Sequence, residues 1–367
     1  MKNSTLTILL IALLICTLSI ISIFSSTYQR DSQAWQNIYQ RQILWVFLGA
    51  VLFLILANIN YRRFWDWTYL LYVISISFLV LVFLLGSVRL GAQRWLRFGW
   101  FNFQPSELAK ICIVIFLARY FSRKDTHSVS SLTEKYGFLR ALLLPLLFVA
   151  LPMGLIIEQP DLGTGLIIFF LFISVLFLSN AKLKYILTFL GLILTLTPFA
   201  WHFLRDYQKD RLMVFLNPNI DPLGAGYTVI QSKIAIGSGG FFGKGWLSGT
   251  QSQLRFLPEA HTDFIFATFS EEWGLLGALV LLFLYYILIR RGFLIAQRTS
   301  DHFGRLLALG VSLMLSIQVI INIAMNMGFA PIVGIPLPLM SYGGSSVFVT
   351  FISLGILANI DKSRAVF

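Results

Sequence analysis

The chain has 367 residues, of which 57% are hydrophobic and 12% are charged, and its formal charge at pH 7 is +12. A soluble domain is about 45–50% apolar and about 25% charged, so this composition excludes an ordinary soluble protein and indicates a chain that lies mainly in lipid. Both cysteines, Cys16 and Cys112, fall within apolar segments, which leaves no disulfide framework and no zinc-ligand spacing.

Ten segments are long and apolar enough to be read as membrane-spanning helices. In chain order they cover residues 5–25, 43–60, 67–86, 105–122, 139–158, 162–180, 183–203, 264–289, 306–329 and 341–360. The first is longer than the apolar core of a usual signal peptide, so we expect it to stay as a helix. The runs are continuous, without the two-residue alternation of barrel strands. We therefore predict an all-α polytopic membrane protein that forms one domain over residues 1–367.

The basic residues predict how these helices are oriented. If the N-terminus lies in the cytoplasm, sixteen Lys and Arg fall on the inner side, and the short outer loops hold only Arg30, Arg41, Arg89, Arg94 and Arg97. Cytoplasmic loops carry the excess of basic residues in membrane proteins, so we expect both termini to be cytoplasmic. The same distribution accounts for the positive charge without a nucleic-acid partner.

One long outer loop, residues 204–262, connects the seventh and eighth predicted spans. It is too small and too rich in glycine for an independent domain, and we expect it to cover a cavity in the helix bundle. Its QSKIAI stretch, residues 231–236, is predicted to form a short helix on the membrane surface, with the glycine clusters making turns around it.

Several polar residues lie where lipid makes them costly. Glu107 and Lys110 of QPSELAK, residues 104–110, are three apart and share one helix face, where they can pair. They are either a structural ion pair or the lining of a substrate path. Asp161 of EQPDLGTG, residues 158–165, either caps the next helix or belongs to a site. The stretch PLPLMSYGGSS, residues 336–346, is read as the entry of the last helix.

The sequence RFLPEAHTDFIFATFSEEWG, residues 255–274, carries the acid of greatest interest. Thr262 or Asp263 is predicted to cap the eighth helix, where the positive field of the helix N-terminus favours an ionised carboxylate. Glu271 and Glu272 lie deeper and face other directions, and we expect them to connect helices through hydrogen bonds. Asp263 alone is placed to take a proton from a molecule that arrives from outside.

The motifs GAQRWL (91–96), QPSELAK (104–110), EQPDLGTGL (158–166), GYTVIQSKIAIGSGGFFGKG (226–245), LPEAHTDFIF (257–266) and PLPLMSYGGSS (336–346) together resemble the SEDS family of bacterial shape, elongation, division and sporulation proteins. The resemblance covers nearly the whole chain, in order. GAQRW and the short termini favour the elongation branch of the family over its division branch.

The resemblance implies a peptidoglycan glycosyltransferase of the bacterial cytoplasmic membrane, which polymerises lipid II and works with a class B penicillin-binding protein, a transpeptidase. Carried over by motif, the essential acid corresponds to Asp263, and Glu107 and Lys110 match polar positions that line the family's central cavity. Asp161, Arg211, Gln231 and Lys244 fall in characteristic stretches and are assigned to substrate binding.

Such an enzyme needs a base near the attacking sugar hydroxyl and positive charge near the leaving diphosphate. Asp263 would be the base, and Arg211, Lys244 and Lys110 are candidates for the positive charge. A divalent cation could share that task, but the sequence holds no dedicated ligand cluster and no cofactor is assigned. Two alternatives stay open: a transporter that flips lipid II, since intramembrane charges also mark translocation paths, and a scaffold without chemistry.

Overall fold

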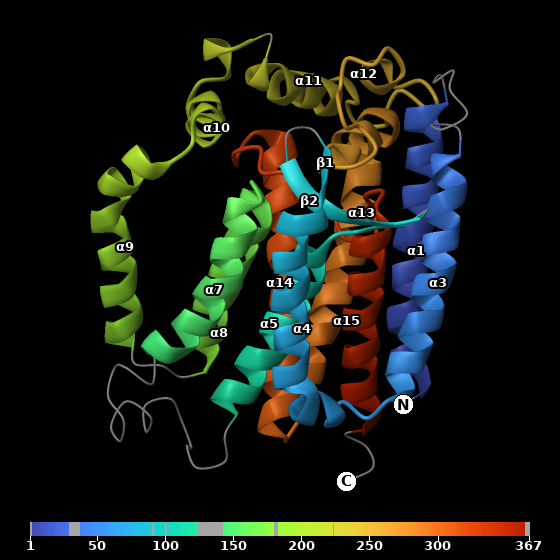
Figure 1. The fold of residues 1–367 in the computed structure, drawn as a ribbon. Coiled ribbons are helices and arrows are strands. Elements are labelled where there is room, and N and C mark those ends of the chain that lie inside the picture. The colour runs from blue at the N-terminus through green and yellow to red at the C-terminus, as the bar shows by residue number, and fades with distance from the viewer. Residues whose placement is uncertain are drawn as a thin grey trace.

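A computed structural model describes residues 2–28, 37–89, 92–99, 101–122, 142–179, 183–222 and 224–363. Its long helices stand side by side in one bundle, and the N-terminal helix begins at the same end at which the C-terminal helix finishes (Figure 1). Helices suit such apolar segments because each helix pairs its own backbone N–H and C=O groups, which lipid cannot do.

A helix lies in each of the ten predicted ranges. These helices are α1 (Lys2–Thr27), α3 (Ile38–Asn58), α4 (Arg63–Leu85), α5 (Pro105–Phe121), α7 (Leu144–Glu158), α8 (Leu162–Leu178), α9 (Leu183–Phe203), α13 (Ile265–Arg298), α14 (His302–Met327) and α15 (Gly344–Ser363). Among the described helices, six are long and apolar enough by length and composition to cross a membrane, namely α1, α3, α4, α13, α14 and α15. The prediction of a helical polytopic membrane protein is confirmed at this level.

Helix α15 is largely buried and packs against α3 through small residues. A Cβ added at Gly49 of α3 would lie 2.4 Å from the ring of Phe351 of α15, and one at Gly355 of α15 would lie 3.0 Å from the Phe53 carbonyl of α3. Helices in lipid associate through this kind of close packing, since apolar side chains gain nothing by leaving lipid. The glycines therefore fix α15 against α3, next to the cavity described below.

The prediction of an all-α fold is wrong in one respect, because a small antiparallel sheet follows α4. Its strands are β1 (Ser87–Arg89), β2 (Ala92–Phe98) and β3 (Phe101–Phe103), paired in that order. Strands this short give little periodic signal, and their stability depends on packing against neighbours that a sequence pattern does not reveal. The GAQRWL motif thus lies largely on β2 and not in an irregular loop.

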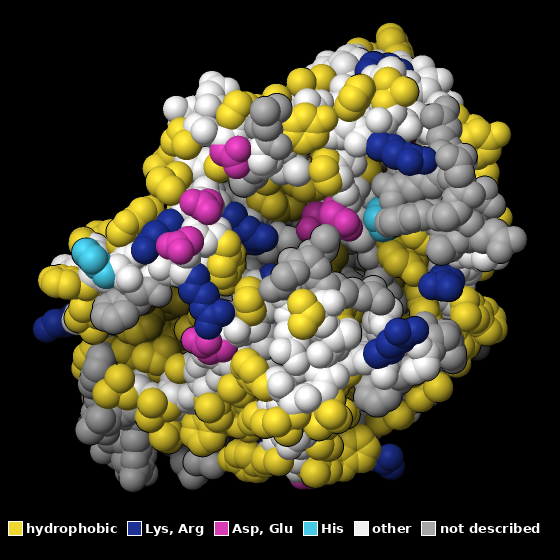
Figure 2. All heavy atoms as spheres, turned by 45° about the horizontal axis from the view of Figure 1, so that its top comes forward, with side chains coloured by type: hydrophobic (Ala, Val, Ile, Leu, Met, Phe, Trp, Pro, Cys, Tyr) yellow, Lys and Arg dark blue, Asp and Glu magenta, His cyan; other side chains and the backbone are white. Residues whose placement is uncertain are grey.

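The predicted outer loop forms the end of the molecule opposite to that at which α1 begins (Figure 1). It contains α10 (Asp206–Leu216), a 3₁₀ turn η2 (Pro218–Ile220), α11 (Ala225–Ser238) and α12 (Thr250–Gln253). The helix predicted at residues 231–236 is confirmed as part of the longer α11, whereas α10 was not predicted. Acidic and basic side chains gather on this end, and hydrophobic side chains cover the flanks (Figure 2).

Helix α13 is broken at Gly274, where φ is +65°. The loop after α11 forms hydrogen bonds to the main chain at this break. The amides of Lys244 and Gly245 donate to the carbonyls of Glu271 and Glu272, each at 3.0 Å. The side chains add to this connection, because Lys244 Nζ lies 2.7 Å from Glu271 Oε1 and the hydroxyl of Ser25 on α1 donates to Glu272. The prediction that the two glutamates connect elements through hydrogen bonds is confirmed.

Candidate active site

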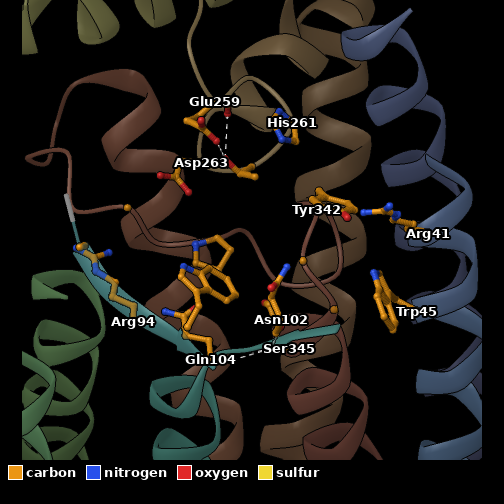
Figure 3. Close-up of a pocket in the computed structure, with 18 of the residues that line it drawn as sticks. Arg41, Trp45, Arg94, Asn102, Gln104, Glu259, His261, Asp263, Tyr342 and Ser345 are labelled. Atoms are coloured by element: carbon orange, nitrogen blue, oxygen red, sulfur yellow. Dashed lines mark hydrogen bonds between the residues drawn. The ribbon is translucent and has the colours of Figure 1, made fainter. Parts of the chain in front are cut away.

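A cavity of about 630 Å³ opens beneath the outer segments of the chain. Its walls come from α3, the sheet, α10, the turn before α13 and the segment before α15. The lining residues are Arg41, Trp45, Ala92, Arg94, Trp95, Phe101, Asn102, Gln104, Arg211, Glu259, His261, Thr262, Asp263, Gly334, Pro336, Tyr342, Gly343, Gly344, Ser345 and Ser346. Figure 3 shows Asp263, Glu259 and His261 along one rim, with Arg94 and Arg41 on opposite sides.

Asp263 reaches this cavity because it stands outside α13. The prediction that Thr262 or Asp263 caps this helix is wrong: the N-cap is Phe264, and it makes no side-chain cap bond. A turn precedes the helix instead, in which the amides of Thr262 and Phe264 donate to the carbonyl of Glu259 at 3.1 and 3.3 Å. The turn keeps the carboxylate of Asp263 off the helix end and exposed to the cavity.

The pKa of the Asp263 carboxyl is raised from 3.8 to about 6. Burial is the main cause, since it disfavours the charged form, and the nearby carboxylate of Glu259 adds to it. Arg94 and Arg211 act in the opposite direction, and Asp161 raises the pKa slightly. A carboxyl with this pKa is mainly ionised at pH 7, as predicted, but it holds a proton more readily than an exposed aspartate does.

Three arginines bring positive charge to the cavity. Arg211 on α10 has a buried Nη1 atom without a hydrogen-bond partner among the described residues. Arg94 on β2 donates to the carbonyls of Gln159 and Pro160. Arg41 on α3 stands on the other side. The sequence predicts a role for Arg211 but not for Arg94 or Arg41. Both of these lie in outer loops, against the general bias of basic residues toward the cytoplasm, and this position is a signal for a role outside.

Asp161 lies in a network at the base of the cavity. It caps α8, since its Oδ1 accepts from the amide of Thr164 at 3.2 Å, which confirms the capping alternative. Its Oδ2 accepts from Ser106 Oγ at 2.9 Å and from Gln104 Nε2 at 3.1 Å. Gln104 also lines the cavity. Asp161 therefore supports the cavity from below, and any contact with a substrate stays a prediction.

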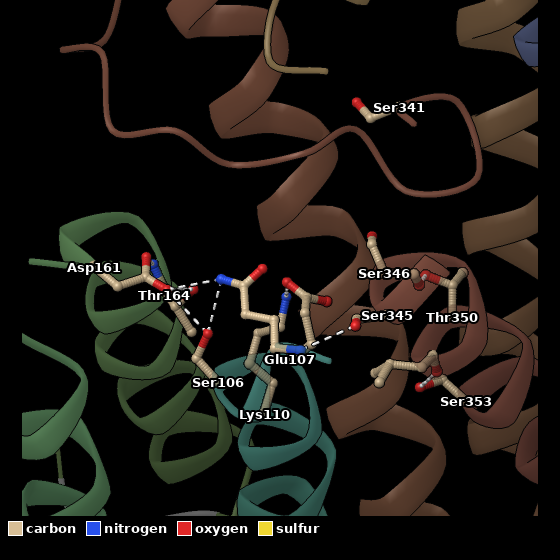
Figure 4. A network of polar contacts seen from close by, with 12 residues as sticks. Ser106, Glu107, Lys110, Asp161, Thr164, Ser341, Ser345, Ser346, Thr350 and Ser353 are labelled. Atoms are coloured by element: carbon tan, nitrogen blue, oxygen red, sulfur yellow. Dashed lines mark hydrogen bonds and ion pairs between the residues drawn. The ribbon is translucent and has the colours of Figure 1, made fainter. Parts of the chain in front are cut away.

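The predicted pair of Glu107 and Lys110 is confirmed. Their side chains meet at 2.7 Å and are nearly fully buried, and neither belongs to the cavity lining. Figure 4 shows them on α5 between the Asp161 network and the serines at the start of α15. The amide of Gln104, just before α5, donates to Ser345 Oγ at 3.0 Å, so the pair lies directly below residues that line the cavity.

The prediction that the segment 336–346 is a helix entry is incomplete. Helix α15 does begin at Gly344, but residues before it form a wall of the cavity. The amide of Tyr342 donates to the carbonyl of His261 at 2.9 Å, and Ser341 Oγ donates to the carbonyl of Thr262 at 2.6 Å. These bonds join the segment to the turn that carries Asp263.

Two predicted substrate-binding residues lie away from this cavity. Gln231 is on α11 and Lys244 is engaged with Glu271, and neither is among the lining residues. Their assignment stays a prediction from the resemblance. Within the described ranges, no group of three or more His, Cys, Asp or Glu side chains is arranged to hold a metal ion.

The fold and the cavity define a polytopic membrane protein with two carboxylates, Asp263 and Glu259, and three arginines around a cavity on the loop-covered end. A family model described as a cell cycle protein, of the FtsW, RodA and SpoVE type, matches residues 4–366. The chain belongs to this family, which is the SEDS family that the motifs indicated.

Relatives of known name cover almost the whole chain. Peptidoglycan glycosyltransferase MrdB of Escherichia coli K12 is 44% identical over 98% of this chain and 93% of its own length. Peptidoglycan glycosyltransferase RodA of Treponema pallidum is 33% identical over 97% of each chain. Stage V sporulation protein E of Bacillus subtilis is 37% identical over 97% of this chain and 96% of its own length.

Two solved structures share the fold. One is a chain from work on the structural coordination of polymerization and crosslinking by a peptidoglycan synthase complex, with a TM-score of 0.81 and 32% identity over 97% of both chains. The other is the rod shape determining protein RodA of Thermus thermophilus, with a TM-score of 0.70 and 27% identity over 97% of this chain and 96% of that one. The predicted likeness to the elongation branch is confirmed.

Proposed function

We propose that this chain is a peptidoglycan glycosyltransferase that polymerises lipid II into β-1,4-linked glycan during cell elongation, with Asp263 as the general base. The observation that carries the proposal is the carboxylate of Asp263, which has a raised pKa and lies on the wall of a large cavity that also holds arginines. Perturbed titratable groups in a cavity mark sites of proton transfer. The names of the relatives supply the class of reaction.

The reaction is one displacement with inversion at the sugar carbon. The 4-hydroxyl of the acceptor's GlcNAc attacks C1 of the donor's MurNAc, and the bond from C1 to the diphosphate oxygen breaks. Asp263 takes the hydroxyl proton, and undecaprenyl pyrophosphate leaves with the bonding pair. Arg211 and Arg94 are placed to stabilise the charge on the leaving diphosphate, because guanidinium groups bind phosphate oxygens strongly.

The enzyme is proposed to sit in the cytoplasmic membrane with ten crossings, both termini in the cytoplasm and the loop of residues 204–262 outside, all in one domain. Helices in all ten ranges and the shared end of α1 and α15 support this topology. The proposed partner is a class B penicillin-binding protein, in line with a structural relative from a peptidoglycan synthase complex.

The proposal is tested with purified protein, its transpeptidase partner and lipid II in vesicles. Polymerised glycan is the expected product. If the protein makes no polymer but moves lipid II between the leaflets, the transporter alternative is correct, since a transporter needs alternating access and has no use for a base at the outer surface.

The raised pKa of Asp263 gives a pH dependence. The base acts when it is ionised, so kcat/KM is expected to be level above the pKa and to fall about tenfold per pH unit below it. The acidic limb should therefore lie at about pH 6 and not near pH 4, where an exposed aspartate titrates. Initial polymerisation rates between pH 5 and pH 8 would measure it, and a rate that stays level down to pH 5 would contradict the assignment.

Replacing Arg211 with glutamine should weaken the enzyme through lost phosphate stabilisation. A charged hydrogen bond contributes about 1.5–3 kcal/mol, so we expect kcat/KM to fall about 10- to 100-fold. Lys209→Gln is the matched control, because it removes the same charge two residues away on α10, on nearly the opposite helix face, and Lys209 does not line the cavity. Equal losses in both variants would show that only the net charge of the loop matters.

A further inference from the structure

The main-chain carbonyl of Asp263 is held by two side chains of α14. Asn322 Nδ2 and Asn326 Nδ2 each donate to this oxygen at 3.0 Å. The two asparagines are four residues apart, so they share one face of the helix, and both are fully buried, at 0% exposure. Two donors from a buried helix thus converge on one atom of the residue that carries the proposed base.

These bonds stand in place of one that a regular helix would supply. In an α-helix the amide of Ala267 would donate to the carbonyl of Asp263. Here that amide donates to the carbonyl of Phe264 at 3.1 Å and to Asn326 Oδ1 at 3.2 Å. The two asparagines therefore supply the hydrogen bonds that the Asp263 carbonyl does not receive from the helix. As a result, the chain can leave helical geometry at Asp263 and turn its side chain to the cavity.

The same side chains hold the neighbouring wall. Asn322 Nδ2 also donates to the carbonyl of Ile335 at 2.7 Å. The preceding residue, Gly334, lies against the carboxylate, since a Cβ added there would be 3.4 Å from Asp263 Oδ2. On the other side, Ser232 of α11 donates to the carbonyl of Asn326 at 2.7 Å. Helix α14 thereby fixes the carboxylate, the wall beside it and α11 relative to one another.

We infer that Asn322 and Asn326 are positioning residues for Asp263, which they hold at its place in the cavity wall through its main chain. The inference rests on the proposed function, because it gives the pair a task in catalysis only if Asp263 is the base. A base must lie within about 2.6–3.2 Å of the hydroxyl it deprotonates. A displacement of about 1 Å can cost about 100-fold in rate. Neither asparagine lines the cavity, so substrate binding does not depend on them directly.

The test replaces each asparagine with leucine, which has a similar shape but donates no hydrogen bond. Polymerisation by the full-length protein with its partner is measured against lipid II concentration and pH. We expect kcat to fall about 10- to 100-fold while KM changes less than about twofold. The acidic limb of kcat/KM should move away from about pH 6, because the carboxylate changes its surroundings. The double variant should be little worse than the more damaging single variant, since both amides act on one oxygen.

Ser312→Ala is the matched control, because this buried hydroxyl on α14 donates only to the helix's own carbonyl of Ala308, at 2.7 Å. It should keep wild-type kcat. A rate that falls only in proportion to the folded fraction, or an unmoved acidic limb with a raised KM, overturns the inference.

If the leucine variants do not fold, Asn322→Ser and Asn326→Ser repeat the test, since serine is too short to reach the carbonyl. If these too are unfolded, the pair is purely structural and the inference is overturned. Asp263→Asn is measured alongside. Wild-type activity in that variant would show that Asp263 is not the base, and this result would contradict the proposed function whatever the asparagine variants do.

Discussion

Replacing Asp263 with asparagine is expected to lower glycan polymerisation about 10²- to 10⁴-fold, the usual contribution of a general base. Asparagine has nearly the same size, and the bonds from Asn322 and Asn326 go to the main chain, so they remain in the variant. The protein should therefore fold and bind lipid II as before, and the loss should appear in kcat. Rates of polymer formation and thermal unfolding of the same preparation separate the two effects.

Asp206→Asn is the control for this experiment. Asp206 is an exposed carboxylate in the first turn of α10 and does not line the cavity, so its removal changes the charge of the outer loop by the same amount. Wild-type rates are expected. Normal polymerisation by Asp263→Asn would show that the base is another group, whereas equal losses in the two variants would indicate a general effect of loop charge.

The membrane helices could be predicted from the sequence because the signal is local: a run of about twenty apolar residues specifies a span by itself. The break of α13 at Gly274 could not be predicted in this way. It depends on amides of a loop about thirty residues earlier in the chain, which donate to main-chain carbonyls of α13 beside the break. The start of α13 was misplaced for a similar reason, since a turn anchored on Glu259 competes with the cap expected at Thr262 or Asp263.

The candidate site was predictable where one residue is informative alone. Ionisable residues within membrane spans are rare and mark functional sites, and Asp263 lies at the edge of such a span. Arg41 and Arg94 reach the same cavity from α3 and β2, more than 160 residues earlier in the chain, and only packing brings them there. In the sequence alone, both residues contribute only to the count of basic residues in the outer loops. Tyr342 and Ser345 were likewise read as a helix entry, because their glycine-rich neighbourhood fits that description equally well.

Replacing Lys110 with methionine is expected to lower the free energy of unfolding by about 3–5 kcal/mol, the usual loss when one partner of a buried ion pair is removed. Lys110 and Glu107 pair at 2.7 Å with side chains 1% and 3% exposed, so the variant would leave a carboxylate without its partner in the protein interior. Unfolding of the detergent-solubilised protein by heat or denaturant would measure the loss, and Glu107→Gln together with Lys110→Met should recover much of it.

The pair of Arg205 and Glu158 provides the contrast, because it has a similar separation of 2.5 Å but side chains that are 51% and 63% exposed. Water stabilises either charge there, so Arg205→Met should change stability by about 1 kcal/mol or less. If Lys110→Met were equally mild, the buried pair would contribute no more to stability than the exposed pair does.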